Sequence, residues 1–428
     1  MEETREMKAR KVLALSLATL TAASMILTGC GGSSSDNSTI KVAIPIPLTG
    51  ESAKAGAEIQ EAYELAFKQI DNKIGDYTVE LDFVDATSDA DKGALALEEA
   101  IVKDGCIVAA SSWNSSVAVA MTDVVNKYSI PWFCSSSSSS VIDEKVASVV
   151  DGGGDAYLIN KIWPTSESLA IGYFELLKGM IEAGTWDAAD VDYAVFCDDT
   201  DFGRVFGSTA KADMEEFGGN CVFEDYTAIN VTDFYTAITK IKESGAKIAF
   251  VQLTNPAGAA AFEKQATESN LNCLRTNDCF TEASNWYELA GESANGTLVC
   301  RSKLVNEYGL QFEKDFEEEY GYTPAATTGG INYDGAKILI KVIEGTIDKY
   351  GEVTSETLYK YGTEVVQTGE FVYDESVLVS SYQYEEGNIN PIVDQDHFYF
   401  QVTQLESGEE VVVWPDQDKE ADIIVPEV

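Results

Sequence analysis

Residues 105–140 read GCIVAASSWNSSVAVAMTDVVNKYSIPWFCSSSSSS and contain two short apolar segments, each followed by hydroxyl and amide side chains. The first apolar segment, 107–110, leads into a polar run at 111–116, and the second, 130–133, leads into Cys134 and six serines. Between them lies a segment with helical periodicity. Strand, helix and strand in this order predict parallel strands, and open parallel sheets bind ligands outside the carboxyl ends of their strands. The stretch therefore predicts a binding site at that edge.

The serine run at 135–140 also has a structural interpretation as a flexible linker, because serine-rich tracts are often unstructured connections. A linker separates domains, whereas this run follows a buried-strand pattern and is succeeded by periodic sequence from Val141. Taken alone, the run leaves both interpretations open, and the surrounding sequence must decide between them.

The same alternation of strands and helices extends over most of the chain. It is interrupted around residues 160–164 and then begins again, which predicts two lobes. Each lobe is expected to be a parallel sheet with helices on both faces, so the fold class is α/β. Two further helices are expected at 309–320 and 331–349, and a β-rich tail from residue 369. The strands expected in the two lobes are 40–46, 77–83, 106–110, 130–133, 193–197, 220–226, 247–253 and 297–301.

Composition limits the classes of function. With 428 residues, 45% of them hydrophobic and 24% charged, the chain is long enough for two or three globular domains. It has 29 basic and 72 acidic residues, for a net charge of −43. Such a surface repels nucleic acid phosphates, so no nucleic acid partner is expected.

The N-terminal residues are typical of an exported protein. Basic side chains at 5–11 precede an apolar run at 12–26 that has the length of a signal-peptide core. Leu27-Thr28-Gly29-Cys30 follows and resembles the lipobox of bacterial lipoproteins. The resemblance implies a signal peptide at 1–29, lipidation of Cys30 and a flexible tether at 30–39. We therefore expect an extracytoplasmic protein held on the cell membrane by a lipid anchor.

Metal and catalytic chemistry lack their usual residues in this sequence. His397 is the only histidine and no Cys-x-x-Cys pair occurs, so a zinc site and histidine-based catalysis are excluded. There is no Gly-x-Ser-x-Gly elbow and no glycine-rich phosphate loop. We therefore expect no enzyme, no cofactor and no metal, and the alternative is an enzyme that uses a pair of carboxylates for acid and base catalysis. Of the seven cysteines that remain after Cys30, Cys273 and Cys279 are the pair whose spacing permits a disulfide, and free buried thiols are the alternative.

Short motifs in a fixed order resemble the type I periplasmic binding proteins, specifically the branched-chain amino acid (Leu/Ile/Val) substrate-binding lipoproteins of ABC transporters. The likeness covers nearly all of residues 40–415. Individual motifs are short, but their order and spacing together are specific. They include Pro47-Leu48-Thr49-Gly50, Asp85-Ala86-Thr87-Ser88-Asp89, Asp199-Thr200-Asp201-Phe202-Gly203, Leu289-Ala290-Gly291-Glu292 and Tyr333-Asp334-Gly335.

The resemblance implies a two-lobe (venus flytrap) fold with three crossovers and a ligand held in the cleft between the lobes. Lobe 1 is expected at 40–164 and 302–370, and lobe 2 at 165–301 and 371–428. Closure of such lobes buries the ligand and changes the outer surface. The partners implied are a small-molecule ligand and an ABC permease in the membrane, and we expect a monomer.

By position, the resemblance assigns the ligand's carboxylate to Asn114, Ser115, Ser136 and Ser138. The residues agree with this assignment, because Ser115 opens a predicted helix whose free N–H groups and dipole attract an anion. Asp278 falls where the family often places an acid for an ammonium group, although an ordinary loop carboxylate is an equal alternative.

The chain departs from the family at Trp113, where a small residue is usual, so we also expect Trp113 in the binding site. Trp163, at the first crossover, has two possible roles, contact with the ligand or packing at the hinge. The ligand therefore stays open: a branched-chain or related amino acid, a short amide or a similar small carboxylate. An extracytoplasmic sensor for the same ligands is the alternative to import.

Overall fold

The computed structural model describes residues 38–186, 191–282, 285–301, 303–304, 306–394, 396–416 and 418–426. The signal peptide, Cys30 and most of the tether predicted for the N-terminus lie outside these residues. Residues 39–428 form one compact unit. Within the described ranges, none of the helices has both the length and the apolar character needed to cross a membrane.

The first sheet is parallel except for a short strand at one edge. Its register places Val42 opposite both Leu81 and Val108, and its first two strands, β2 and β3, are antiparallel. The strand order is β2 (Lys73–Ile74), β3 (Tyr77–Asp85), β1 (Thr39–Ile46), β4 (Val108–Ala110), β5 (Trp132–Cys134) and β6 (Leu158–Lys161).

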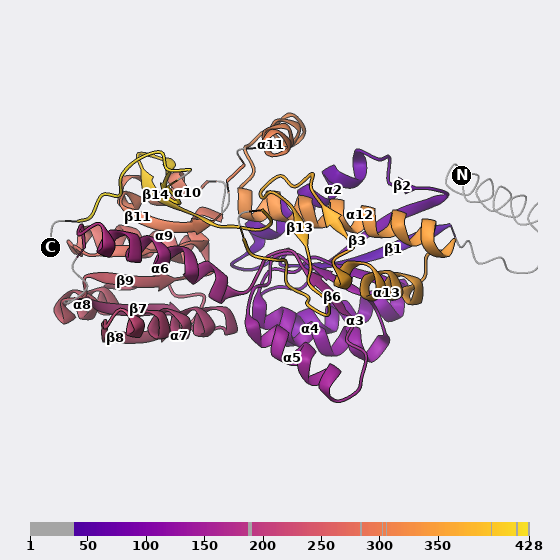
Figure 1. The fold of residues 1–428 in the computed structure, drawn as a ribbon, viewed down its shortest axis with the longest axis horizontal. Helices are drawn as coiled ribbons and strands as arrows, with labels where there is room; N and C mark the ends of the chain where they lie inside the picture. The colour runs from indigo at the N-terminus through magenta and orange to yellow at the C-terminus, as the bar shows by residue number, and fades with distance from the viewer. Residues whose placement is uncertain are drawn as a thin grey trace, which may run out of the picture. The chain divides into compact units, whose positions relative to one another are not determined.

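Helices cover both faces of this sheet because side chains in a strand alternate between the two faces. Val42 and Ile44 of β1 belong to the core beneath α2 (Ala53–Lys68) and α12 (Ile331–Tyr350). Ala43, between them, belongs to the core on the opposite face, which α3, α4 and α5 cover (Figure 1). The remaining helices of this lobe are α3 (Ala90–Glu99), α4 (Ser115–Tyr128), α5 (Ser140–Asp151), α11 (Glu307–Tyr320) and α13 (Ser355–Glu364).

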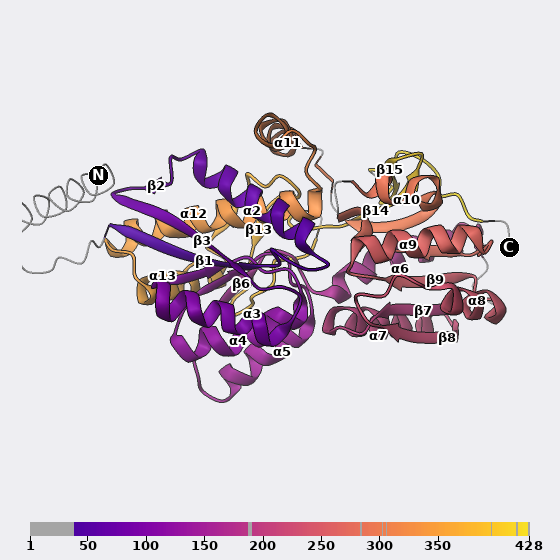
Figure 2. The ribbon, with the colours of Figure 1, turned by 180° about the vertical axis from the view of Figure 1, so that it is seen from behind.

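The second sheet has a parallel centre and two antiparallel strands at one edge. Its order is β15 (Glu409–Trp414), β14 (Gln401–Glu406), β11 (Thr297–Arg301), β10 (Leu274–Thr276), β9 (Ile248–Gln252), β7 (Asp192–Asp198) and β8 (Asn220–Thr227). One face carries α6 (Ser166–Glu182) and α7 (Asp201–Glu216), and the other carries α8 (Tyr235–Ser244), α9 (Pro256–Glu268) and α10 (Trp286–Ala290) (Figures 1 and 2). Two α/β lobes with helices on both faces of each sheet confirm the predicted fold class.

Short helical turns connect several of these elements. They are η1 (Ala100–Asp104), η3 (Cys279–Glu282), η4 (Gly291–Ala294), η5 (Ala326–Gly330) and η6 (Val366–Thr368).

The segment after residue 370 packs against the first sheet before the chain returns to the second. This segment contains β12 (Val372–Tyr373) and β13 (Tyr382–Gln383), which pair with each other. Tyr384 accepts a hydrogen bond from Asn160 of β6 (2.7 Å), and its hydroxyl donates to the carbonyl of Lys161 (3.0 Å). Strand β14 then joins the second sheet. The sequence predicted a lobe boundary at 370/371. Because the segment up to about residue 400 packs on the first sheet, we propose that the boundary lies near residue 400 instead.

Candidate functional site

A cavity lies between the two sheets, where the carboxyl ends of their strands meet. Side chains of both lobes line it, among them hydroxyl, amide and aromatic groups. All six ligand-site candidates from the sequence line this cavity, five from the first lobe and Asp278 from the second. The five are Trp113, Asn114, Ser115, Ser136 and Ser138.

The N-terminus of α4 forms part of the first-lobe wall. Asn114 is its N-cap residue, with extended backbone (φ −74°, ψ 124°) and no side-chain capping bond, and Ser115 and Ser116 begin the helix. The first N–H groups of a helix have no intrahelical partner, and the helix dipole adds positive potential there. This wall is therefore suited to an anion.

The serine run after β5 is an ordered loop rather than a linker. Its odd-numbered members face inward: Ser135 bonds with the hydroxyl of Tyr63 (3.1 Å), and Ser137 donates to Ser112 (2.8 Å). Ser139 caps α5 by accepting from the N–H of Val141. The even-numbered Ser136 and Ser138 line the cavity.

Ser136 and Ser115 are held in place by neighbouring residues. The Ser136 hydroxyl accepts a hydrogen bond from the side-chain amide of Asn332 (2.9 Å), and Ser115 Oγ accepts from the N–H of Ser139 (3.3 Å). Both hydroxyls therefore keep their own proton available as a donor.

Asp278 lies just beyond β10 on the opposite wall and is 2% exposed. Its Oδ1 accepts from the N–H of Cys300 (2.7 Å) and from the hydroxyl of Tyr173, and its Oδ2 accepts from Gln252 Nε2 (3.1 Å). Burial raises the pKa of Asp278, and the positive charge of Arg301 and the three hydrogen bonds partly offset that rise.

Arg301 is a cavity residue that the sequence did not reveal. It ends β11, is 3% exposed, and donates from Nη1 to Thr327 Oγ1 of the first lobe (2.8 Å) and from Nη2 to the backbone oxygen of Asp278. The signal was present in Thr297–Arg301, an apolar strand that ends in a charged residue at the ligand-binding edge.

The two lobes touch beside the cavity. Arg301 reaches Thr327 across the cleft, and the N–H of Asp201, at the start of α7, approaches Ser116 Oγ of α4 to 3.4 Å. The two lobes therefore contact each other at the side of the cavity in this structure.

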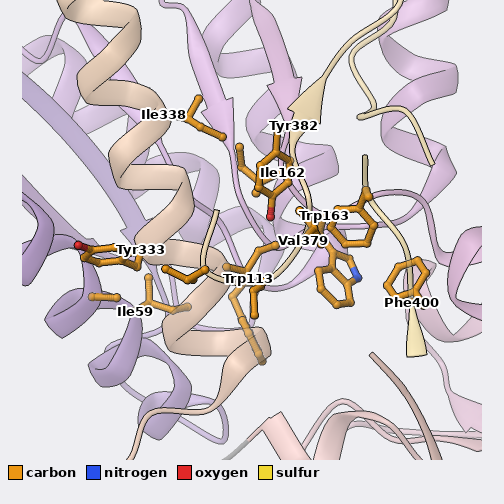
Figure 3. Close-up of a cluster of buried hydrophobic side chains, with 14 of the residues drawn as sticks. Ile59, Trp113, Ile162, Trp163, Tyr333, Ile338, Val379, Tyr382 and Phe400 are labelled. Carbon is orange, nitrogen blue, oxygen red and sulfur yellow. The ribbon is translucent and has the colours of Figure 1, made fainter. Parts of the chain in front are cut away.

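Aromatic rings form much of the apolar part of the lining, together with Ile229. Trp113, Trp163 and Phe202 all line the cavity. Trp163 also packs edge-on against Phe398 (5.5 Å between ring centroids) and Phe400 (5.2 Å), as Figure 3 shows for Phe400. Trp163 thus combines the two roles considered from the sequence, because it packs at the crossover and faces the cavity.

Among the described residues, the seven cysteines are free thiols, so Cys273 and Cys279 are not joined by a disulfide. Within the same ranges, no cluster of three histidine, cysteine or acidic side chains is arranged to hold a metal ion.

Two α/β lobes with a cavity lined from both of them have the architecture of a solute-binding protein. The periplasmic binding protein family matches residues 39–367, and the chain therefore belongs to that family. The family resemblance found in the sequence is confirmed.

Individual relatives agree with this assignment. The Leu/Ile/Val-binding protein homolog 6 of Brucella suis is 25% identical over 319 residues, which cover 72% of this chain and 76% of that protein. The branched-chain amino acid transporter substrate-binding protein LivJ from Streptococcus pneumoniae, solved in complex with isoleucine, has a TM-score of 0.69 at 16% identity and covers 91% of this chain and 100% of its own. An ABC transporter solute-binding protein from R. palustris, solved in complex with benzoate, has a TM-score of 0.70 at 18% identity, covering 90% and 99%. At these identities the structural likeness shows the fold.

Proposed function

We propose that this protein is an extracytoplasmic solute-binding lipoprotein of an ABC importer. It binds an amino acid, branched-chain or related, or a similar small carboxylate in the cavity between its two lobes and delivers it to a permease. Its role in this proposal is binding and presentation, without catalysis.

The observation that carries the proposal is the composition of the cavity wall at α4. Asn114, Ser115, Ser136 and Ser138 come from two neighbouring strand ends of one lobe and meet at a helix N-terminus. Neutral donors and a helix dipole are suited to a carboxylate, and no charged partner is needed on that side.

The relatives support a small carboxylate as the ligand class. One is named for leucine, isoleucine and valine, one was solved with isoleucine and one with benzoate. These ligands share a carboxylate and an apolar body. They differ in the ammonium group, which isoleucine has and benzoate lacks.

The remaining parts of the proposal concern the membrane side. Lipidation of Cys30 after removal of residues 1–29 tethers the mature protein outside the cell membrane, next to its permease. The protein acts as a monomer. In this proposal lobe 1 consists of residues 40–164 and 302 to about 400, and lobe 2 consists of residues 165–301 and the residues after about 400.

A thermal-shift screen tests the proposal. The panel contains the common amino acids, their amides and small carboxylates. A ligand present at ~100 times its dissociation constant stabilises the folded protein by ~2.7 kcal/mol, an easily measured shift. Stabilisation by at least one amino acid or carboxylate is expected. Absence of a shift across the whole panel would contradict the proposed function.

A further inference from the structure

We infer that the cavity selects a carboxylate that has an apolar or aromatic body and carries no ammonium group. This inference rests on the proposed function and narrows its ligand class. It follows from comparing one acceptor and one donor that line the cavity: the carboxylate of Asp278 is already bonded, whereas the indole N–H of Trp113 beside α4 has no partner among the described residues.

Asp278 is the acceptor that an ammonium group would need, and its carboxylate is already bonded. A carboxylate offers about four lone-pair positions, and three are filled by Tyr173, Cys300 and Gln252. All three donors come from Asp278's own lobe.

The charge of Asp278 is also balanced. Among the described residues that line the cavity, Asp278 and Arg301 are the two that carry charge, and the guanidinium of Arg301 donates to the backbone oxygen of Asp278. An ammonium group placed beside Asp278 would lose its hydration close to the positive charge of Arg301. Few hydrogen bonds would compensate for that loss, because most lone pairs of the Asp278 carboxylate are already used.

The first-lobe wall, by contrast, contains buried polar atoms that have no hydrogen-bond partner among the described residues. Trp113 Nε1 is buried and has no hydrogen-bond partner in the described part of the chain. The side-chain oxygen of Asn114, which is a hydrogen-bond acceptor as placed, is also buried and without a partner in the described ranges. Both residues are 8% exposed. A rotation of the amide can turn its NH2 group toward a ligand.

These donors adjoin the N-terminus of α4, so an anion placed there receives the indole N–H, the amide and the helix N–H groups together. A buried donor without a partner is costly, and a carboxylate oxygen satisfies it. The rings of Trp113, Trp163 and Phe202 line the same cavity and offer apolar surface for the rest of the ligand.

Matched ligand pairs test the inference by isothermal titration calorimetry on the full-length chain. The pairs are 3-phenylpropanoate with L-phenylalanine, and 4-methylpentanoate with L-leucine, which differ only in the amino group. We expect at least one amine-free acid to bind at least tenfold more tightly than its amino acid. Its primary amide, which lacks the negative charge, is expected to bind at least tenfold more weakly than the acid.

The outcomes separate the inference from the proposed function. Tighter or equal binding of the amino acid in both pairs would overturn the inference and leave a solute-binding function in place. If no carboxylate, amide or amino acid binds, both are overturned.

A variant provides a second test of the carboxylate position. Trp113→Phe keeps an aromatic ring and removes the indole N–H, so it is expected to weaken binding of the preferred acid about tenfold. Trp186→Phe is the matched control, because Trp186 is not among the described residues that line the cavity, and it should leave the affinity unchanged. An unchanged affinity in Trp113→Phe would overturn the placement of the carboxylate.

Discussion

Replacing Glu58 with glutamine is expected to remove a pH-dependent loss of stability from this protein. Glu58 lies on α2, is 2% exposed, and accepts hydrogen bonds through Oε1 from the N–H groups of Ala325 and Gly329, both at 2.9 Å. Desolvation by burial raises the pKa of Glu58 from 4.5 to about 8, and it outweighs the two hydrogen bonds, which lower the pKa. The folded protein therefore holds this carboxyl group protonated at neutral pH.

The magnitude follows from the two pKa values. Because the folded-state pKa lies above the unfolded one, the stabilising contribution is complete below about pH 4.5 and is lost as the pH rises through about 8. One pKa unit corresponds to about 1.4 kcal/mol. Between pH 4.5 and pH 7, the free energy of unfolding of the wild-type protein should thus fall by about 3 kcal/mol relative to Glu58→Gln.

The assay is urea denaturation of both proteins at intervals between pH 4.5 and pH 8.5. The difference between their unfolding free energies isolates Glu58, because distant titrating groups contribute equally to both proteins. An NMR titration of the Glu58 carboxyl carbon should give a midpoint near 8. A difference that changes by less than about 0.5 kcal/mol over this range would refute the reasoning, since Glu58 would then titrate alike in the folded and unfolded chains.

Three further predictions concern the cavity, the packing of α6 and the membrane anchor. The double substitution Ser115→Ala and Ser138→Ala should weaken binding of the ligand identified in the screen by on the order of 1–3 kcal/mol. The control Ser148→Ala, on the exposed surface of α5, should leave the affinity unchanged, and equal affinities of the double variant and the control would place the ligand elsewhere. In denaturation experiments Gly172→Ala should lower the free energy of unfolding by about 1–3 kcal/mol, because its Cβ would lie 2.4 Å from Cys300 Sγ. Gly179→Ala, on the same helix, places its Cβ in open space and should raise the free energy of unfolding by up to about 1 kcal/mol, so equal effects of the two substitutions would contradict the packing. Cys30→Ser should shift the protein from the membrane fraction to the medium or periplasm, and retention of the variant on the membrane would exclude anchoring through Cys30.

Local patterns in the sequence were sufficient for the fold class and for the edge of the sheet where the cavity lies. Apolar segments at 107–110 and 130–133 became β4 and β5, and the polar residues after them line the cavity, because the carboxyl ends of adjacent parallel strands share one edge. This rule needs only the order of strands and helices. The choice of Asn114 and Ser136 among the polar residues at that edge came from the family resemblance.

The tertiary structure alone decided which side chains in the cavity are already occupied. Asp278 receives its hydrogen bonds from Tyr173, Gln252 and Cys300, and Arg301 reaches Thr327 in the other lobe. The tertiary structure also decided the position of the segment after residue 370. This segment packs on the first sheet, although the strands that follow it in the sequence belong to the second sheet. Strand and helix periodicity is set by a residue's near neighbours, whereas these contacts join residues far apart in the chain. Only the packing of the two lobes brings such residues within hydrogen-bonding distance.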